Sequence, residues 1–150
     1  MKKLNLLVAL ALGVALLSGC SGSSSSGTGN AYAGVYTGSS TITLRGLGDT
    51  YTETVPLRVV VGVDGRVDAS TPGSTGATCA GPQVPTYLVG NKASGTATNV
   101  SCTSADLKCT ISGTITYTFA DASASQTGNV VMNYNVGRVD ATYAGFVRKA

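Results

Sequence analysis

The chain of 150 residues contains no histidine and no tryptophan, and charged residues make up only 11% of it. Without histidine, nucleophilic catalysis by a Ser-His-Asp or Cys-His arrangement is excluded, as is a zinc site that needs imidazole beside cysteine. The sequence contains neither a Cys-x-x-Cys pair nor a phosphate-cradling glycine motif. We therefore expect a protein that is not an enzyme and that holds neither a cofactor nor a metal ion.

Charge of either sign is scarce, with ten lysine and arginine residues against seven aspartate and glutamate residues. No basic stripe and no alternation of basic with aromatic residues occurs, so we expect no nucleic-acid partner. Asp64 and Asp68 lie close together around a predicted hairpin turn. A glycosidase uses a pair of carboxylates, but aspartate beside a turn ordinarily forms the turn and faces solvent. We interpret both residues in that ordinary way.

The longest apolar run, 6–17, contains only Leu, Val, Ala and Gly. It is shorter than the roughly 20 residues that a membrane-spanning helix needs. Lys2 and Lys3 precede the run, and the small residues Ser18 and Gly19 follow it. A positive start, a short apolar centre and small residues at the exit are typical of a secretory signal.

The segment Leu17-Ser18-Gly19-Cys20 resembles the lipobox of bacterial lipoproteins. The resemblance implies a helical signal peptide at 1–19, removed once the Cys20 thiol has received a diacylglyceryl group with palmitate-type chains. Two or more acyl chains anchor a protein stably to a membrane. Ser21 stands where inner-membrane members of the family carry Asp, which implies the outer membrane if the source is Gram-negative. The alternatives are a secreted protein with a chance cysteine and an uncleaved N-terminal helix.

After the signal, the sequence divides into two further parts. Residues 20–30 comprise the lipidated cysteine and the linker SGSSSSGTGN. A flexible linker of this length has a typical span of about 16–19 Å. Residues 31–150 suit a single β-domain, because the core would come from Val, Ile, Leu, Ala, Tyr and Phe on strands.

Alternation of apolar and polar residues dominates from Ala31 onward and predicts eight strands with no helix among them. They are 34–44, 51–63, 66–70, 84–89, 95–102, 107–119, 129–136 and 139–148. The short connections favour an antiparallel meander. We expect an all-β fold, with a small β-barrel preferred because closure removes sheet edges and a β-sandwich as the alternative.

Two segments near the ends of the domain are similar: 32–36 reads YAGVY and 143–147 reads YAGFV. If the first and last strands pair, these segments could be neighbours in the sheet. Chance similarity between two strands rich in alanine and glycine explains the match equally well.

Three cysteines remain once Cys20 is assigned to lipid: Cys79, Cys102 and Cys109. They allow at most one internal disulfide, which an oxidising envelope favours. Cys102 and Cys109 flank a six-residue turn, and opposed residues of a hairpin can approach disulfide geometry. We therefore favour the Cys102–Cys109 pair. A bond from Cys79 to either of the other two is the competing possibility.

These observations leave two hypotheses for the function. The first is a lipid-anchored cell-envelope protein whose β-domain is a binding or structural module, with another envelope protein, or a host or environmental component, as its partner. The second is a calycin-like carrier or sensor of a small apolar ligand, since an eight-stranded barrel can hold one. An exposed aromatic patch around Tyr32, Tyr51 or Tyr87 would favour the first. The hydroxyl row Thr114-x-Thr116-x-Thr118 suits an ordinary solvent-facing strand.

Overall fold

The computed structural model describes residues 30–72, 78–79, 86–104 and 107–150. Every regular element in these ranges is a strand, and all strand pairs are antiparallel. The strands are β1 (Gly34–Gly46), β2 (Asp49–Val61), β3 (Arg66–Ser70), β4 (Thr78–Cys79), β5 (Thr86–Tyr87), β6 (Lys92–Ser104), β7 (Leu107–Ala120), β8 (Ser123–Tyr134) and β9 (Gly137–Lys149). No helix in these ranges has the length and apolar character to cross a membrane.

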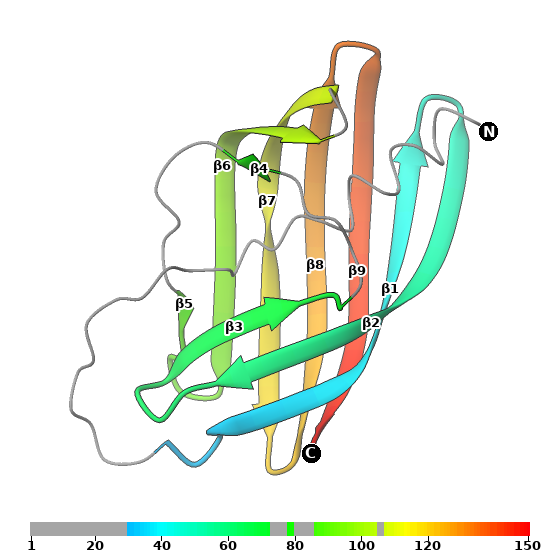
Figure 1. The fold of residues 1–150 in the computed structure, drawn as a ribbon. Helices are drawn as coiled ribbons and strands as arrows, with labels where there is room; N and C mark the ends of the chain where they lie inside the picture. The colour runs from blue at the N-terminus through cyan, green and yellow to red at the C-terminus, as the bar shows by residue number, and fades with distance from the viewer. Residues whose placement is uncertain (1–29, 73–77, 80–85, 105–106) are drawn as a thin grey trace.

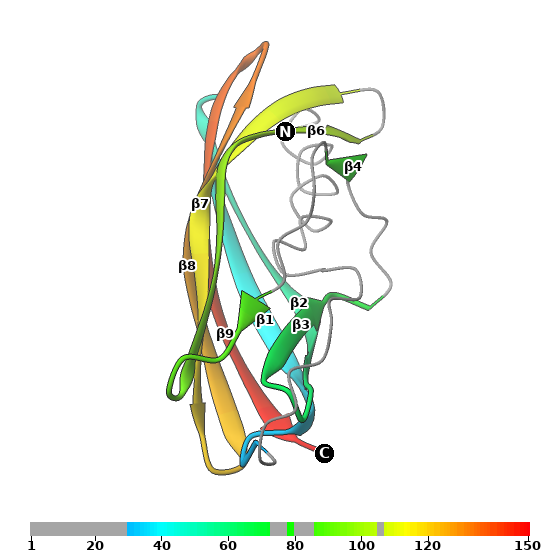
Figure 2. The ribbon, with the colours of Figure 1, turned by 90° about the vertical axis from the view of Figure 1, so that its left-hand side faces the viewer.

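One sheet contains all the described strands, in the order β4-β6-β7-β8-β9-β1-β2-β3-β5. The sheet curls so strongly that β5, at one end of this order, lies beside β6, near the other end (Figures 1 and 2). The result is a nearly closed barrel, which confirms the predicted all-β fold and the preference for a barrel over a sandwich.

The alternation of the sequence determines which side of each strand faces the core. Along β7 the apolar side chains from Cys109 to Phe119 are buried, whereas the hydroxyl side chains between them are exposed or half-buried. The other long strands follow the same rule, because successive side chains of a strand point to opposite faces. The largest fully buried side chains are Tyr36, Phe119, Leu44, Ile111, Met132, Val59 and Val67.

The first and last long strands do pair, which joins the N-terminal hairpin to the C-terminal meander. Tyr36 lies opposite Lys149, and Ile42 lies opposite Tyr143. The similar segments 32–36 and 143–147 are therefore offset along the β1–β9 pair and do not face each other.

Most strands differ from their predicted bounds by one to three residues, β8 differs by more at its start, and β4 was not predicted. β8 begins at Ser123, although the sequence pattern predicts a loop over 121–127. The difference arises because Gln126, a polar residue, occupies an inward position and interrupts the alternation that signals a strand. Of the predicted strand 84–89, the structure shows β5 at Thr86–Tyr87, and residues 84–85 lie outside the described ranges.

Gly113 and a β-bulge bend β7 and β6 at the same level. The pairing of the two strands shifts between Ala97 and Val100, and Asn99 takes a left-handed φ of 48°. Gly113, opposite Ala97, has a φ of 154°, which favours glycine. Beyond this level both strands lean across one end of the barrel (Figure 2).

The described domain begins and ends at the opposite end of the barrel, called here the entry end (Figure 1). Ala150 N donates a hydrogen bond to Val35 O at 2.8 Å, and Lys149 N donates to Ala122 O at 2.7 Å. Inside this end, the Tyr36 ring packs edge-on against Phe119, with 5.4 Å between ring centroids. The hairpin turns 46–49 and 134–137 lie at the other end, called the far end.

Candidate functional site

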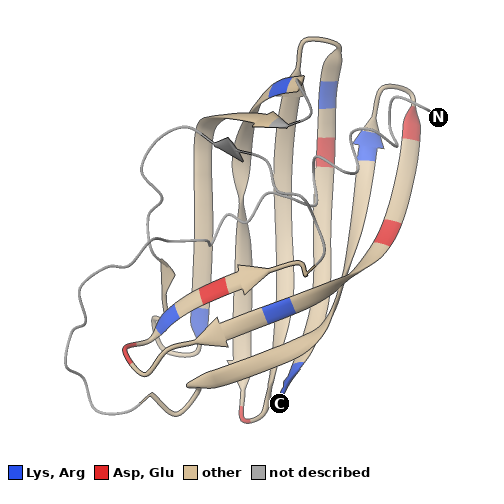
Figure 3. Cartoon of the chain, viewed as in Figure 1, with Lys and Arg blue, Asp and Glu red and all other residues tan. Residues whose placement is uncertain are grey.

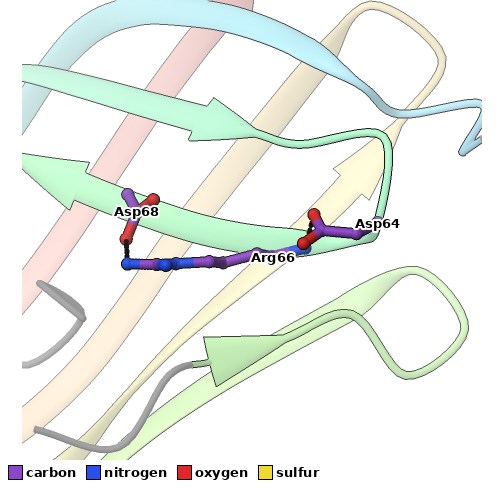
Figure 4. Close-up of polar contacts among 3 residues, drawn as sticks. All are labelled: Asp64, Arg66 and Asp68. Carbon is purple, nitrogen blue, oxygen red and sulfur yellow. Dashed lines mark hydrogen bonds and ion pairs between the residues drawn. The ribbon is translucent and has the colours of Figure 1, made fainter. Parts of the chain in front are cut away.

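The two carboxylates considered as a catalytic pair are engaged separately (Figure 4). Asp64 Oδ1 accepts a hydrogen bond from Arg66 N at 3.1 Å, which stabilises the β2–β3 turn. Asp68 Oδ1 instead lies 3.3 Å from Arg66 Nη2. Since Arg66 stands between them, the two carboxylates form no glycosidase-like pair. Among the described residues, no three His, Cys, Asp or Glu side chains gather to hold a metal ion.

The predicted Cys102–Cys109 disulfide is not formed in the structure. The two residues lie directly opposite each other on β6 and β7, as the hairpin predicts. Cys109 is nevertheless a free, buried thiol. On its other side, Cys102 has a second cysteine opposite it in register, Cys79 on β4, so the topology gives Cys102 two cysteine neighbours rather than one. Burial raises the pKa of the Cys109 thiol, so this thiol is poorly reactive.

A row of polar side chains crosses the apolar interior on four neighbouring strands. Tyr117 on β7, Gln126 on β8, Gly145 on β9 and Ser40 on β1 are partners in register. Gln126 Nε2 donates a hydrogen bond to Tyr117 OH at 2.8 Å, and Ser40 Oγ donates to Gln126 Oε1. Ser40, Gln126 and Tyr117 are each at most 5% exposed. We call these three side chains the inner polar row.

Gly145 makes the inner polar row possible. A Cβ at position 145 would lie 2.7 Å from Gln126 Oε1, so a side chain there would displace the Gln126 amide from its present position. Because glycine leaves this space empty, the Gln126 amide reaches across β9 to Ser40. The sequence gives no local signal for this contact, since Ser40 and Gln126 are 86 residues apart.

The phenols of the interior are neutral groups at physiological pH. Burial raises the pKa of Tyr117, Tyr134 and Tyr143 far above its usual value. Burial also raises the pKa of Tyr36 to a smaller degree. Such phenols can donate and accept hydrogen bonds, but they do not lose a proton to act as bases near neutral pH.

Glu53 adds a carboxylate to the same interior surface. It lies opposite Ile42 in register, on the inward side of β2. Its Oε2 atom is buried and has no hydrogen-bond partner among the described residues. A buried carboxylate oxygen without a donor is costly, so this oxygen is the interior atom most suited to accept a hydrogen bond from a ligand.

The outer surface of the barrel carries two rows of uncharged side chains across six strands. One row consists of Ser94, Thr116, Thr127, Ala144, Thr41 and Thr54. The other consists of Thr96, Thr114, Asn129, Thr142, Thr43 and Thr52. We call them together the hydroxyl face. Sheet geometry spaces their side chains about 4.8 Å apart between strands and about 6.8 Å apart along each strand.

Neighbouring hydroxyls of this face bond one another at several positions. Ser94 Oγ lies 2.9 Å from Thr116 Oγ1, and Thr41 Oγ1 lies 3.1 Å from Thr54 Oγ1. Lysine, arginine, aspartate and glutamate concentrate toward the barrel ends and on β2 and β3, which leaves long uncharged stretches of β6, β7 and β8 (Figure 3). The hydroxyl face thus presents hydrogen-bonding groups without charge.

Phe146 is the exposed aromatic residue next to the hydroxyl face. Half of its side chain is exposed, and it lies between Ser125 and Ser39 in register. The Arg148 guanidinium lies 5.7 Å from its ring centroid. Sequence reasoning missed Phe146, which lies on the outward, polar side of an alternating strand. The only signal that could have identified it is the alternation of β9, which places position 146 on the outer surface.

The three tyrosines considered from the sequence do not form a common aromatic patch. Tyr32 packs against Phe119, with 5.8 Å between ring centroids, and Tyr51 is half-buried against the core. Only Tyr87 is exposed, at 38%. The lipobox and Cys20 lie outside the described residues, so lipidation stays a prediction from the sequence.

Comparison with known proteins adds no relative: no family model, no curated protein and no solved structure matches the chain.

Proposed function

We propose that the protein is a lipid-anchored cell-envelope protein whose barrel is a non-enzymatic binding module. The observation that carries the proposal is the hydroxyl face with Phe146 beside it. Such a surface suits a neutral partner, because charged partners would lose solvation without gaining a counter-charge. We propose another envelope protein as that partner, and the outer membrane as the site of attachment.

The polarity of the barrel supports a position outside the hydrocarbon of the membrane. Its buried inner side chains are mainly apolar, and the outer side chains of β7 and β8 are mainly Thr and Ser. A barrel that spans a membrane places apolar side chains on the outside, facing lipid. A covalent lipid anchor at Cys20 would therefore be what attaches this domain to the membrane.

Metabolic labelling with a fatty acid tests the anchor. The full chain is expected to incorporate the label and to fractionate with membranes, because Cys20 supplies the thiol that receives the lipid. The Cys20→Ala variant is expected to incorporate none. Label on that variant would contradict the proposal, and Cys109→Ala is the matched control because its buried thiol takes no part.

Site-specific photo-crosslinking in cells tests the binding face. A photoreactive residue at Thr116 or Thr127, in the middle of one hydroxyl row, is expected to give a discrete adduct. The same residue at Val136, exposed at the far end, is the control. Introducing Thr142→Lys should weaken the adduct, because a charge in this uncharged face must be desolvated by a neutral partner. Equal adducts at Thr116 and Val136 would contradict the assignment of the face.

A second candidate function is supported by the inner polar row and Glu53. The calycin-like alternative, a carrier or sensor of a small apolar ligand, needs an apolar interior with a few placed polar groups. Tyr117, Gln126, Ser40 and Glu53 are such groups. Native mass spectrometry of the purified protein separates the two candidates, since a carrier retains a small-molecule adduct and a surface-binding module does not.

A further inference from the structure

We infer that the entry end of the barrel rests on the surface of the lipid bilayer, with Val63 and Val89 in contact with the headgroup region. This inference rests on the proposed lipid anchor and specifies the orientation of the anchored domain. Four observations carry it: where the chain enters the barrel, which side chains are exposed there, how charge is distributed around them, and how long the linker is.

The chain joins the barrel at the β2–β3 turn. Asn30 begins the described domain, and it forms a turn in which Ala33 N donates to Asn30 O at 3.0 Å. Asn30 Nδ2 lies 3.4 Å from the position that a Cβ on Gly65 would occupy. The described part of the chain therefore begins beside this turn.

Two exposed valines flank this point on adjoining turns. Val63, in the β2–β3 turn, is 72% exposed, and Val89, in the turn between β5 and β6, is 82% exposed. Leu88 N donates to Gly65 O at 2.9 Å, which holds the two turns together. Tyr87 is also exposed and lies opposite Arg66 in register. Exposed aliphatic side chains beside a tyrosine suit the membrane interface. There the apolar side chains contact the boundary of the acyl chains, while the tyrosine hydroxyl stays among water and headgroups.

Charge around these tips is nearly balanced. Asp68 forms an ion pair with the Arg66 guanidinium, whereas Asp64 accepts a hydrogen bond from the Arg66 backbone N–H. Lys92 and Asp121 are exposed on neighbouring turns, and the Lys149 ammonium lies 5.8 Å from the Tyr36 ring centroid. The contact therefore needs no anionic lipid, and it should not depend strongly on the charge of the bilayer.

The linker keeps this end near the membrane. Ten residues, 21–30, separate Cys20 from the barrel in the sequence, and their Gly/Ser-rich composition predicts a span of about 16–19 Å. A short flexible link gives an effective concentration in the millimolar range. Contacts too weak to bring a free domain to a membrane are then sufficient to orient a tethered one.

The absence of tryptophan from the chain permits a direct test. The variants Val63→Trp and Val89→Trp place a single fluorophore at the entry end, and Val136→Trp places one at the far end as control. Each full-length acylated protein is reconstituted into vesicles of phosphatidylethanolamine and phosphatidylglycerol, with and without lipids brominated in the acyl chains. We expect bromolipid to quench both entry-end fluorophores at least about twofold more than the far-end fluorophore, since interfacial side chains approach the acyl boundary.

The outcomes separate this inference from the proposed function. Equal quenching at all three positions, in protein that carries the acyl mass and floats with the vesicles, overturns the orientation alone. Protein without acyl mass that does not float overturns the anchor and the orientation together. Entry-end emission that shifts with protein density but not with bromolipid overturns the bilayer contact in favour of a second copy of the chain. Quenching is measured separately for Val63→Trp and Val89→Trp, so the test still stands if one of the two variants misfolds.

Discussion

The contact between Gln126 and Ser40 depends on one missing side chain, that of Gly145. Glycine at this position lets an amide cross a whole strand inside an apolar barrel. Buried polar groups in folded proteins are nearly always hydrogen-bonded, because an unpaired one is costly. The inner polar row therefore restricts which strands can lie together, because β7, β8, β9 and β1 must be in register for its bonds to form.

Replacement of Ser40 tests how much the inner polar row contributes to the free energy of unfolding. Ser40→Ala leaves Gln126 Oε1 buried without its donor, which should lower the free energy of unfolding by about 1–3 kcal/mol. Thr142→Ala on the exposed side of β9 is the control and should change it by less than about 0.5 kcal/mol. Urea denaturation followed by circular dichroism measures both. Equal stability of the two variants would show that the Ser40 bond contributes nothing.

At the scale of the element, β6 and β7 owe their bend to the bulge at Asn99 and to Gly113. Asn99 N donates to Ser112 Oγ at 2.9 Å, so the extra residue of the bulge is bonded to the neighbouring strand. A Cβ at Gly113 would lie 2.6 Å from Val130 Cα and closer still to Asn129 O. The close approach of β7 and β8 at this level requires glycine at position 113. The bend that results directs both β6 and β7 across the far end of the barrel.

Replacement of Gly113 should therefore separate β7 from β8. Gly113→Ala combines a strained φ with a clash against backbone, and we expect a loss of at least about 3 kcal/mol in the free energy of unfolding. Gly90→Ala, where φ is also positive but no atom lies within 4 Å of the added Cβ, should cost only about 1–2 kcal/mol. Thermal denaturation of the pair measures the difference, and losses of equal size would argue against the backbone clash.

At the scale of the whole molecule, the barrel protects three phenols from water. Tyr117, Tyr134 and Tyr143 stand on three neighbouring strands, β7, β8 and β9, and none is more than 9% exposed. Burial raises the pKa of each phenol because the phenolate loses its hydration inside the barrel. The folded state accordingly holds these protons at pH values where the unfolded chain has released them.

Alkaline titration tests this protection. Unfolded tyrosine has a pKa of about 10. Below that pH both states hold the protons and the stabilisation is complete; above it the unfolded state binds fewer protons, so the free energy of unfolding falls as pH rises. We expect the ultraviolet absorbance of these three phenolates to appear only at the pH where β-structure is lost. Tyr143→Phe should reduce the absorbance change that accompanies this loss of structure. Ionisation of all seven tyrosines near pH 10, before unfolding, would contradict the buried positions.

Local patterning was sufficient to determine the strands and their inward faces, because alternation with period two acts over a few residues. Thus the inward residues of 107–119 were predictable, as was the turn at Asp64-Gly65. The lipobox is likewise a local motif, and it remains the basis for the proposed anchor. Local patterning failed at β8, where Gln126 takes an inward position that only a partner on a distant strand can satisfy.

Tertiary structure alone decided the contacts between residues far apart in the chain. Pairing of β1 with β9 closes most of the barrel, and it determines that Gln126 meets Ser40. The sheet also places a second cysteine, Cys79, opposite Cys102 in register, and Cys109 is a free, buried thiol. Such contacts depend on how the sheet curls and which edges approach, and no periodicity along one strand contains that information.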